Sequence, residues 1–274
     1  MRIVMPLFGY KSSGINRYSF MSYPFSIVKL MSEDIIETKL FSKQDIGYME
    51  LESWSLVFDG DVAADYIECS HLLLMSFRVL SPGKAPFIKY PICKEDLHLC
   101  SRLDDTMVHN YESDISTKAY CLSDLQQVDT YLGRLIEMKA VSNRTKNALY
   151  FALRGMTAYK WIDAFVMYMS AIESLFSKDE AAGATKTIKK RVTCLLNPVI
   201  GVTRDDIGVL YALRSDMVHG RVEISDDPKE NLRKLAKLER ILKACFDIFL
   251  RKRLYENYKS MEERNKFMVT LDGS

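Results

Sequence analysis

The 274-residue chain changes its pattern of hydrophobic and polar positions near residue 123. Before that point, short runs rich in aromatic and β-branched residues are separated by Asp-Gly and Ser-Pro-Gly turns. This pattern is typical of strands, and it predicts them over residues 55–60, 68–80 and 85–93. Residues 25–36 (FSIVKLMSEDII) are expected to add some helix. The first part of the chain is therefore predicted to be mixed or β-rich.

From Ser123 onward, apolar residues recur at helical spacing. Helices are predicted over residues 123–140, 147–159, 160–176, 186–196, 203–220 and 225–254. The helix at 160–176 has the widest apolar stripe, which predicts a central position; the stripe consists of Trp161, Phe165, Tyr168, Met169, Ile172 and Phe176. The helix at 186–196 is expected to stop at Asn197-Pro198, and the helix at 203–220 begins with a capping box, Thr203 and Asp206. Short links without strands predict a helical bundle.

These patterns predict an α+β protein, in which a mixed or β-rich N-terminal domain precedes an all-α bundle. We expect residues 1–122 to form the first domain, with a sensing or docking role. Residues 123–142 would form a connecting helix, residues 143–255 the bundle, and residues 256–274 a C-terminal tail.

Composition narrows the class of protein. The chain is 48% hydrophobic and 27% charged, which is normal for a globular protein with a core. No apolar run approaches the roughly 20 residues that cross a bilayer, and the first residues lack the apolar stretch of a secretion signal. We therefore expect a cytoplasmic protein without membrane association. The six cysteines form no CxxC pair, and Cys93, His98, Cys100 and His109 match no common zinc spacing, so no metal or cofactor is expected.

Charge is distributed unevenly along the chain. Residues 1–142 contain 14 Lys and Arg against 19 Asp and Glu, a net charge of −5, whereas residues 143–274 contain 24 against 17, a net charge of +7. A basic second half fits a polyanionic partner such as RNA. Lysine-rich helical surfaces produce the same balance, so the charge alone leaves both interpretations open.

The segment YALRSDMVHGR (211–221) carries the most informative motif of the chain. Gly220 stands where helices often end in a left-handed residue. Arg214 and His219 are about 140° apart around an ideal helix. His219, however, lies in the last turn, where its side chain can swing toward the arginine. Asp216, three residues before His219, is close enough to hydrogen-bond the imidazole.

Arginine and histidine together suit phosphate chemistry. A guanidinium is always charged and binds phosphate with two donors, and the partial negative charge of a helix C-terminus favours a protonated histidine. A histidine at a helix end also caps a carbonyl in many proteins, and a second Arg–His pair, Arg102 and His109, lies in an expected loop. Spacing alone therefore allows a catalytic or a structural role for Arg214 and His219.

Three helices together resemble one family. LRSDMVHG (213–220) resembles the R-x4-H signature of the HEPN superfamily, most closely its Apea-like group. The helix AFVMYMSAIESLFSKD, with Glu173, looks like that group's acidic helix, and KTIKKRVTCLL looks like its basic connecting helix; the resemblance covers roughly residues 145–255. It implies a metal-independent endoribonuclease that acts as a homodimer in a defence or toxin setting, or an inert binding module. Ser215 departs from the pattern, because many active members carry a larger polar residue there.

The resemblance implies a role for each residue. His219 would act as general base or acid, its counterpart in a second protomer would transfer the other proton, and Arg214 would stabilise the charge on phosphorus. Glu173 either holds the Arg214 guanidinium or is a solvated charge, and Ser215 and Asp216 would support the pair. Candidate RNA contacts are Lys186, Lys189, Lys190, Arg191 and Arg221. The N-terminal domain would bind a trigger or partner. The alternative is a non-catalytic HEPN module for dimerisation or nucleic-acid binding.

Overall fold

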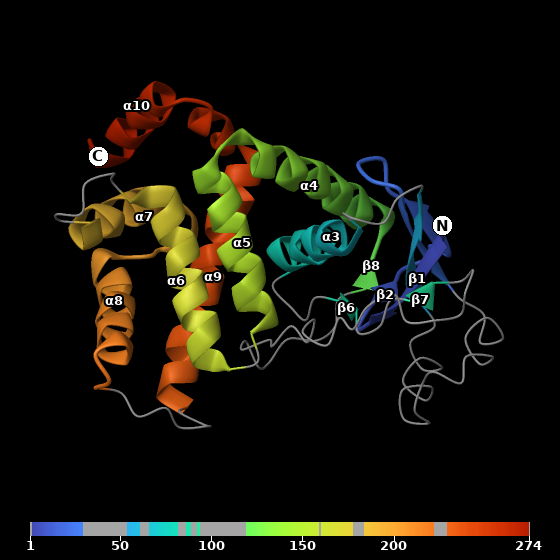
Figure 1. The fold of residues 1–274 in the computed structure, drawn as a ribbon, viewed down its shortest axis with the longest axis horizontal. Coiled ribbons are helices and arrows are strands. Elements are labelled where there is room, and N and C mark those ends of the chain that lie inside the picture. Colours follow the sequence, from blue (N-terminus) through green and yellow to red (C-terminus); the bar gives the residue numbers. More distant parts are fainter. Residues whose placement is uncertain are drawn as a thin grey trace. The chain divides into compact units, whose positions relative to one another are not determined.

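The computed structural model describes residues 2–29, 54–60, 66–81, 86–88, 92–93, 119–158, 160–177, 184–221 and 229–273. These residues contain eight α-helices and a small antiparallel sheet, so the protein is α+β (Figure 1). The chain divides into two compact units, unit 1 (Met1–Gly133) and unit 2 (Arg134–Ser274). The division falls inside α4 (Leu122–Val141), which is the expected connecting helix and contributes residues to both units.

Unit 1 is built on the antiparallel sheet, whose strand order is β3-β4-β5-β1-β6. Its strands are β1 (Arg2–Phe8), β3 (Arg17–Ser19), β4 (Phe25–Lys29), β5 (Trp54–Asp59), β6 (Phe87–Ile88) and β7 (Ile92–Cys93), of which β7 also pairs with β1. A parallel pair, β2 (Lys11–Ser12) and β8 (Ala119–Tyr120), forms a second sheet. Alternate residues of β1 (Ile3, Met5 and Leu7) are buried, as expected for a strand with one face on the core.

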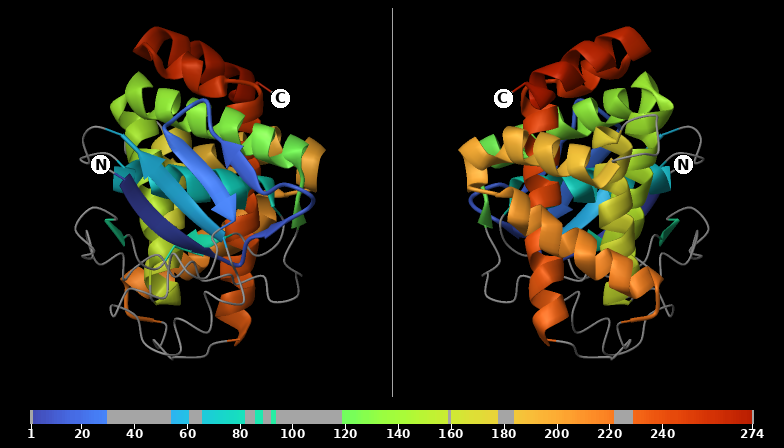
Figure 2. Two further views of the ribbon diagram at one scale, coloured as in Figure 1. Left: turned by 90° about the vertical axis from the view of Figure 1, so that its right-hand side faces the viewer. Right: turned by 90° about the vertical axis from the view of Figure 1, so that its left-hand side faces the viewer.

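The helix α3 (Tyr66–Leu80) corrects the prediction of a strand over residues 68–80. Ten of its fifteen residues are buried, including polar Ser70 and Ser76. A helix that is covered on most sides loses the 3.6-residue alternation, so a short apolar run cannot be assigned from periodicity. Residues 25–36 were expected to contain helix, but Phe25–Lys29 form β4; the remainder lies outside the described residues. Figure 2 shows α3 behind the sheet of unit 1.

Unit 2 is a helical bundle arranged around α6 (Trp161–Phe176). The helices α5 (Asn143–Thr157), α7 (Ala184–Ile200), α8 (Arg204–Val218) and α9 (Lys229–Arg251) all pack against α6. All six residues of its predicted apolar stripe are buried, which confirms its central position. The helix α7 continues to Ile200 with Pro198 in its last turn, so it does not stop at Asn197-Pro198 as expected. Pro198 lacks the N–H that would donate to the carbonyl four residues earlier, so the last turn of α7 has one backbone donor fewer.

Residues 256–274 do not form a tail. A 3-10 helix, η1 (Leu254–Tyr258), leads into α10 (Met261–Asp272), and α10 packs against α7 and η1. The carboxylate of Asp272 accepts two hydrogen bonds from Arg191, at 3.0 Å to Nε and 2.7 Å to Nη2. Met268 and Leu271 are buried. Apolar burial and this ion pair together fold the segment, so the bundle extends to Asp272.

The cysteine and histidine residues whose spacing matched no common zinc pattern lie mostly outside the described residues. His98, Cys100 and His109 lie outside the described residues, and of Cys93 only the backbone is described. Among the residues that are described, no three His, Cys, Asp or Glu side chains gather in a group that could hold a metal ion. Cys69, Cys121, Cys194 and Cys245 are not joined in disulfide bonds, and complete burial raises the pKa of the Cys245 thiol. Within the same ranges, no helix has the length and apolarity needed to cross a membrane.

Candidate functional site

The two ends of α8 are fixed by local hydrogen bonds, as its sequence predicts. At the start, Thr203 Oγ1 accepts from the Asp206 backbone N–H at 3.2 Å, and Asp206 Oδ2 accepts from the Thr203 N–H at 2.9 Å. At the end, Gly220 has a φ of 67° and donates to Met217 O at 3.2 Å, while the Arg221 N–H donates to Asp216 O at 2.8 Å. These two bonds form a Schellman motif and fix the backbone on both sides of His219.

Arg214 projects from α8 toward α6 and forms an ion pair with Glu173. The distance from Arg214 Nη1 to Glu173 Oε1 is 2.8 Å, and the two side chains are 31% and 26% exposed. Of the two roles considered for Glu173, the structure therefore favours the one that holds the guanidinium. Burial raises the pKa of Tyr211, and the nearby Glu173 carboxylate adds to the effect, so this phenol stays protonated.

Arg214 and His219 line the same open pocket, which has a volume of about 530 Å³. The other lining residues come from α7 and α8 and are Thr185, Lys189, Gly208, Tyr211, Ala212, Ser215 and Val218. His219 is the C-cap residue of α8, with φ −90° and ψ 8°. These angles depart from helical geometry, so the 140° separation of a regular helix does not apply strictly at His219. Both helices face the viewer in the right-hand view of Figure 2.

The supporting residues differ from expectation at one position. Asp216 was expected to reach the His219 imidazole, but its carboxylate lies 3.6 Å from Arg221 Nη1. Asp216 and Arg221 are both exposed or half-exposed. Among the described residues, the imidazole of His219 has no hydrogen-bond partner and is exposed to solvent. Ser215 is exposed and lines the pocket beside Arg214.

The five basic residues proposed as RNA contacts occupy three environments. Lys189 lines the pocket, while Lys186 and Arg221 are exposed outside it. Lys190 donates to Asp272 O. Arg191 is only 5% exposed, and it donates to Phe176 O at 2.7 Å in addition to its two bonds with Asp272. Lys190 and Arg191 therefore hold α7 against α10, and the guanidinium of Arg191 is enclosed rather than available to RNA.

Gly208, Thr185 and Tyr211 belong to the pocket but were not found from the sequence. A Cβ atom added to Gly208 would lie 3.0 Å from Lys189 Nζ and 3.4 Å from its Cε, so the lysine side chain crosses α8 at this glycine. The available signal was a glycine in the interior of a helix, where it is unfavourable. That signal gives no indication of which side chain from another helix occupies the space.

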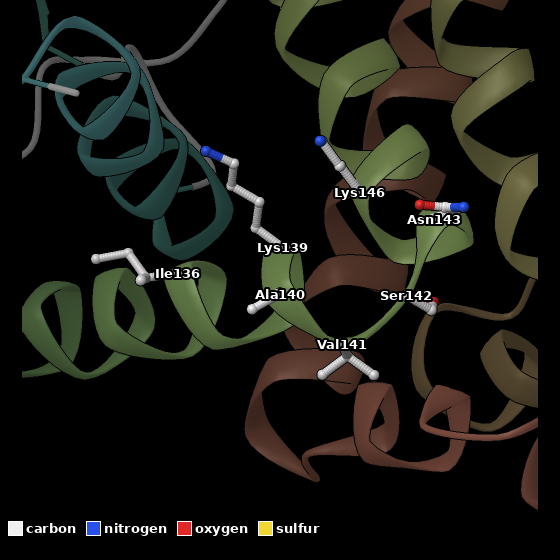
Figure 3. Close-up of a pocket in the computed structure, with 7 residues that line it drawn as sticks. All are labelled: Ile136, Lys139, Ala140, Val141, Ser142, Asn143 and Lys146. Atoms are coloured by element: carbon white, nitrogen blue, oxygen red, sulfur yellow. The ribbon is translucent and has the colours of Figure 1, made fainter. Parts of the chain in front are cut away.

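A second, larger depression of about 740 Å³ lies where α4 meets α5, within unit 2. It is lined by Ile136, Lys139, Ala140, Val141, Ser142, Asn143 and Lys146. Figure 3 shows the side chains of Lys139 and Lys146 on the same side of this junction. Ser142 accepts from the Thr145 N–H as the cap of α5, so its hydroxyl is engaged in the fold. The lining contains neither histidine nor carboxylate, which leaves the α7–α8 pocket as the better candidate for proton transfer.

Three groups thus line the α7–α8 pocket. They are the guanidinium of Arg214, which pairs with Glu173, the ammonium of Lys189, which lies against Gly208, and the exposed imidazole of His219. This set of groups can bind an anion and exchange a proton with it. Its function has to be inferred from the chemistry of these side chains, because comparison with protein-family models, curated proteins and solved structures found no match.

Proposed function

We propose that unit 2 is a metal-independent endoribonuclease of HEPN type, with Arg214 and His219 as its catalytic residues. The observation that carries the proposal is that both residues line one pocket together with Lys189. The likeness of residues 145–255 to the HEPN superfamily supports the same reaction. Unit 1 would bind the trigger or partner that controls cleavage, in a defence or toxin setting.

The reaction needs two proton transfers and one stabilised charge. A base removes the proton from the RNA 2′-hydroxyl, and that oxygen attacks the adjacent phosphorus. The bond from phosphorus to the 5′-oxygen then breaks, and an acid protonates the leaving oxygen. The products are a 2′,3′-cyclic phosphate and a 5′-hydroxyl, so the step consumes no water. Arg214 would stabilise the additional charge on phosphorus, and His219 would carry one of the two protons.

The second proton carrier would come from a second copy of the chain. One bundle provides a single histidine in the pocket, and His219 stands at its exposed rim. Val218, which lines the pocket beside His219, is 67% exposed. Covering it in a homodimer would bury apolar surface and bring two His219 side chains to one RNA strand. We expect sedimentation at micromolar concentration to report a dimer; a strict monomer would contradict this assembly.

The test compares cleavage of mixed RNA by wild type, Arg214→Ala and His219→Ala, all with excess chelator and at matched thermal stability. His219→Ala should lower the rate by about 10²–10⁴, because it removes a proton carrier. Arg214→Ala should lower it by about 10²–10³, because it removes a preorganised charge contact. His109→Ala, in the other Arg–His segment, should cleave as wild type does. End-group analysis should find a 2′,3′-cyclic phosphate and a 5′-hydroxyl.

The second candidate is a non-catalytic module that binds nucleic acid. The observation that favours it is the exposed imidazole of His219, for which the described residues provide no orienting partner. This candidate predicts RNA binding that Arg214→Ala weakens, without cleavage of any RNA by wild type, by unit 2 alone or by the dimer. That outcome would replace the nuclease proposal.

A further inference from the structure

Gly208 occupies an interior position of α8, where its backbone is ordinary helix. The glycines with positive φ among the described residues are Gly9, Gly14, Gly201 and Gly220, so Gly208 does not need the conformational freedom of glycine. Glycine in a helix interior lowers helix stability relative to alanine. The absence of a side chain must therefore matter for what lies beside the helix.

The neighbour at this point is a single side chain, Lys189 of α7. Apart from its chain neighbours and the backbone of its own helix, the described atoms within 4 Å of a Cβ built on Gly208 are Nζ and Cε of Lys189. The contact at 3.0 Å is tighter than ordinary van der Waals contact, so even an alanine would displace the ammonium by a few tenths of an ångström. Gly208 thus provides the space in which the end of the lysine side chain lies.

The ammonium adds a positive charge that the pocket does not neutralise. Arg214 is balanced by Glu173, whereas no carboxylate pairs with Lys189 among the described residues. Of the acidic residues of α8, Asp206 is paired with Lys237 and Asp216 with Arg221, and Asp205 lies in the first turn, outside the lining of the pocket. Two cations from different helices therefore line one pocket, and Glu173 pairs with only one of them, an arrangement that suits a phosphate group.

We propose that Gly208 is a positioning residue, which seats the Lys189 ammonium beside Arg214 so that both cations bind one phosphate of the RNA chain. The choice of RNA as the source of the phosphate rests on the proposed function. The anion subsite itself depends only on Lys189, Arg214 and Gly208. A larger side chain at position 208 would push the ammonium out of the pocket and leave Arg214 alone.

The experiment measures binding of a mixed-sequence 2′-O-methyl RNA to the full chain at several salt concentrations. This probe lacks the 2′-hydroxyl, so its binding is independent of cleavage. Gly208→Met should weaken binding about tenfold and reduce the slope of log K against log salt by about 0.7, as expected for one lost phosphate contact on a single strand. The same variant should raise the thermal unfolding midpoint by about 2 °C, because methionine is the better helix former. Loss of binding with gain of stability is not expected from general damage to the fold.

A double-mutant cycle tests whether Gly208 acts through the lysine. Lys189→Met should cause the same loss of binding as Gly208→Met, and the double variant should lose no more than either alone. Lys189→Arg should retain most binding, and Lys252→Met serves as the charge-matched control outside the pocket. Additive losses, or wild-type binding by Gly208→Met, would overturn the inference even if wild type cleaves RNA. Wild-type binding of the probe without cleavage of ordinary RNA would reject the nuclease and leave the phosphate subsite in place.

Discussion

At the scale of single residues, the site depends on how Arg214 distributes its hydrogen bonds. Nη1 donates to Glu173 at 2.8 Å, and Nε is buried without a partner among the described residues. A single contact therefore orients the guanidinium, and it leaves the other terminal nitrogen for a ligand. Because both side chains are about a quarter to a third exposed, solvent screens the pair and its contribution to folding is small. The main effect of this ion pair is to orient the guanidinium of Arg214.

This interpretation predicts a separation between binding and catalysis in Glu173→Gln. The glutamine keeps the size and an acceptor oxygen but removes the negative charge beside Arg214. We expect RNA binding to stay equal or become tighter, while kcat falls about tenfold because the guanidinium is held less firmly. The free energy of unfolding should change by less than about 1 kcal/mol. Single-turnover cleavage with separate binding measurements checks this, and wild-type kcat in the variant would contradict the positioning role.

At the scale of elements, α8 is held at its first turn by more than its capping box. Lys237 of α9 pairs with Asp206, and the Thr203 N–H donates to the same carboxylate. These contacts, the lysine first, lower the pKa of Asp206 from 3.8 to about 2. The folded state thus favours the ionised carboxylate. The stability that these contacts give is complete above about pH 4 and is lost as the pH falls toward about 2.

The resulting prediction concerns the difference between wild type and Lys237→Met. At pH 6 the variant should unfold at a lower temperature, because Asp206 loses its charged partner. Toward pH 2 the two midpoints should converge, because the protonated Asp206 no longer attracts Lys237 in wild type. Thermal unfolding at pH 6, 4 and 2 measures the difference. A gap that stays constant with pH would show that the ion pair does not stabilise this helix.

The elements also show which features can be read from the sequence. The limits of α8 and the central place of α6 follow from short-range rules, namely caps and periodicity. The spacing of Arg214 and His219, about 140° apart on an ideal helix, does not by itself place them in one pocket. The helix α3 could not be predicted, because burial on most sides removes its periodicity. The contact of Lys189 with Gly208 and the ion pair of Asp216 with Arg221 could not be predicted either. They depend on packing between helices or on the geometry of the turn after α8, which no residue pattern encodes.

At the scale of the whole molecule, unit 2 is closed by a contact between distant parts of the chain. Arg191 is 5% exposed and Asp272 is 33% exposed, and their side chains meet through two hydrogen bonds. A buried guanidinium that loses its carboxylate partner is strongly unfavourable. The bundle predicted to end at residue 255 therefore depends on α10, which the sequence pattern did not indicate because its few buried residues leave most of the helix polar.

We therefore predict that Asp272→Ala lowers the free energy of unfolding by on the order of 3 kcal/mol, because Arg191 keeps only its bond to Phe176 O. Urea unfolding of the full chain measures this change. The control is Glu262→Gln on the same helix, which breaks the exposed pair with Lys266 and should cost less than about 0.5 kcal/mol. Equal effects of the two substitutions would show that burial of Arg191 does not matter.

The pairing of Arg191 with Asp272 also sets an order of events during protein synthesis. Asp272 lies 81 residues after Arg191, so α7 emerges from the ribosome well before the carboxylate that pairs with its Arg191. At roughly 5–20 residues per second, the delay is about 4 to 16 s. During that time the α7–α8 pocket lacks the support of α10. A nascent chain that is still attached to the translation machinery, and surrounded by its RNA, would thus carry an unfinished site.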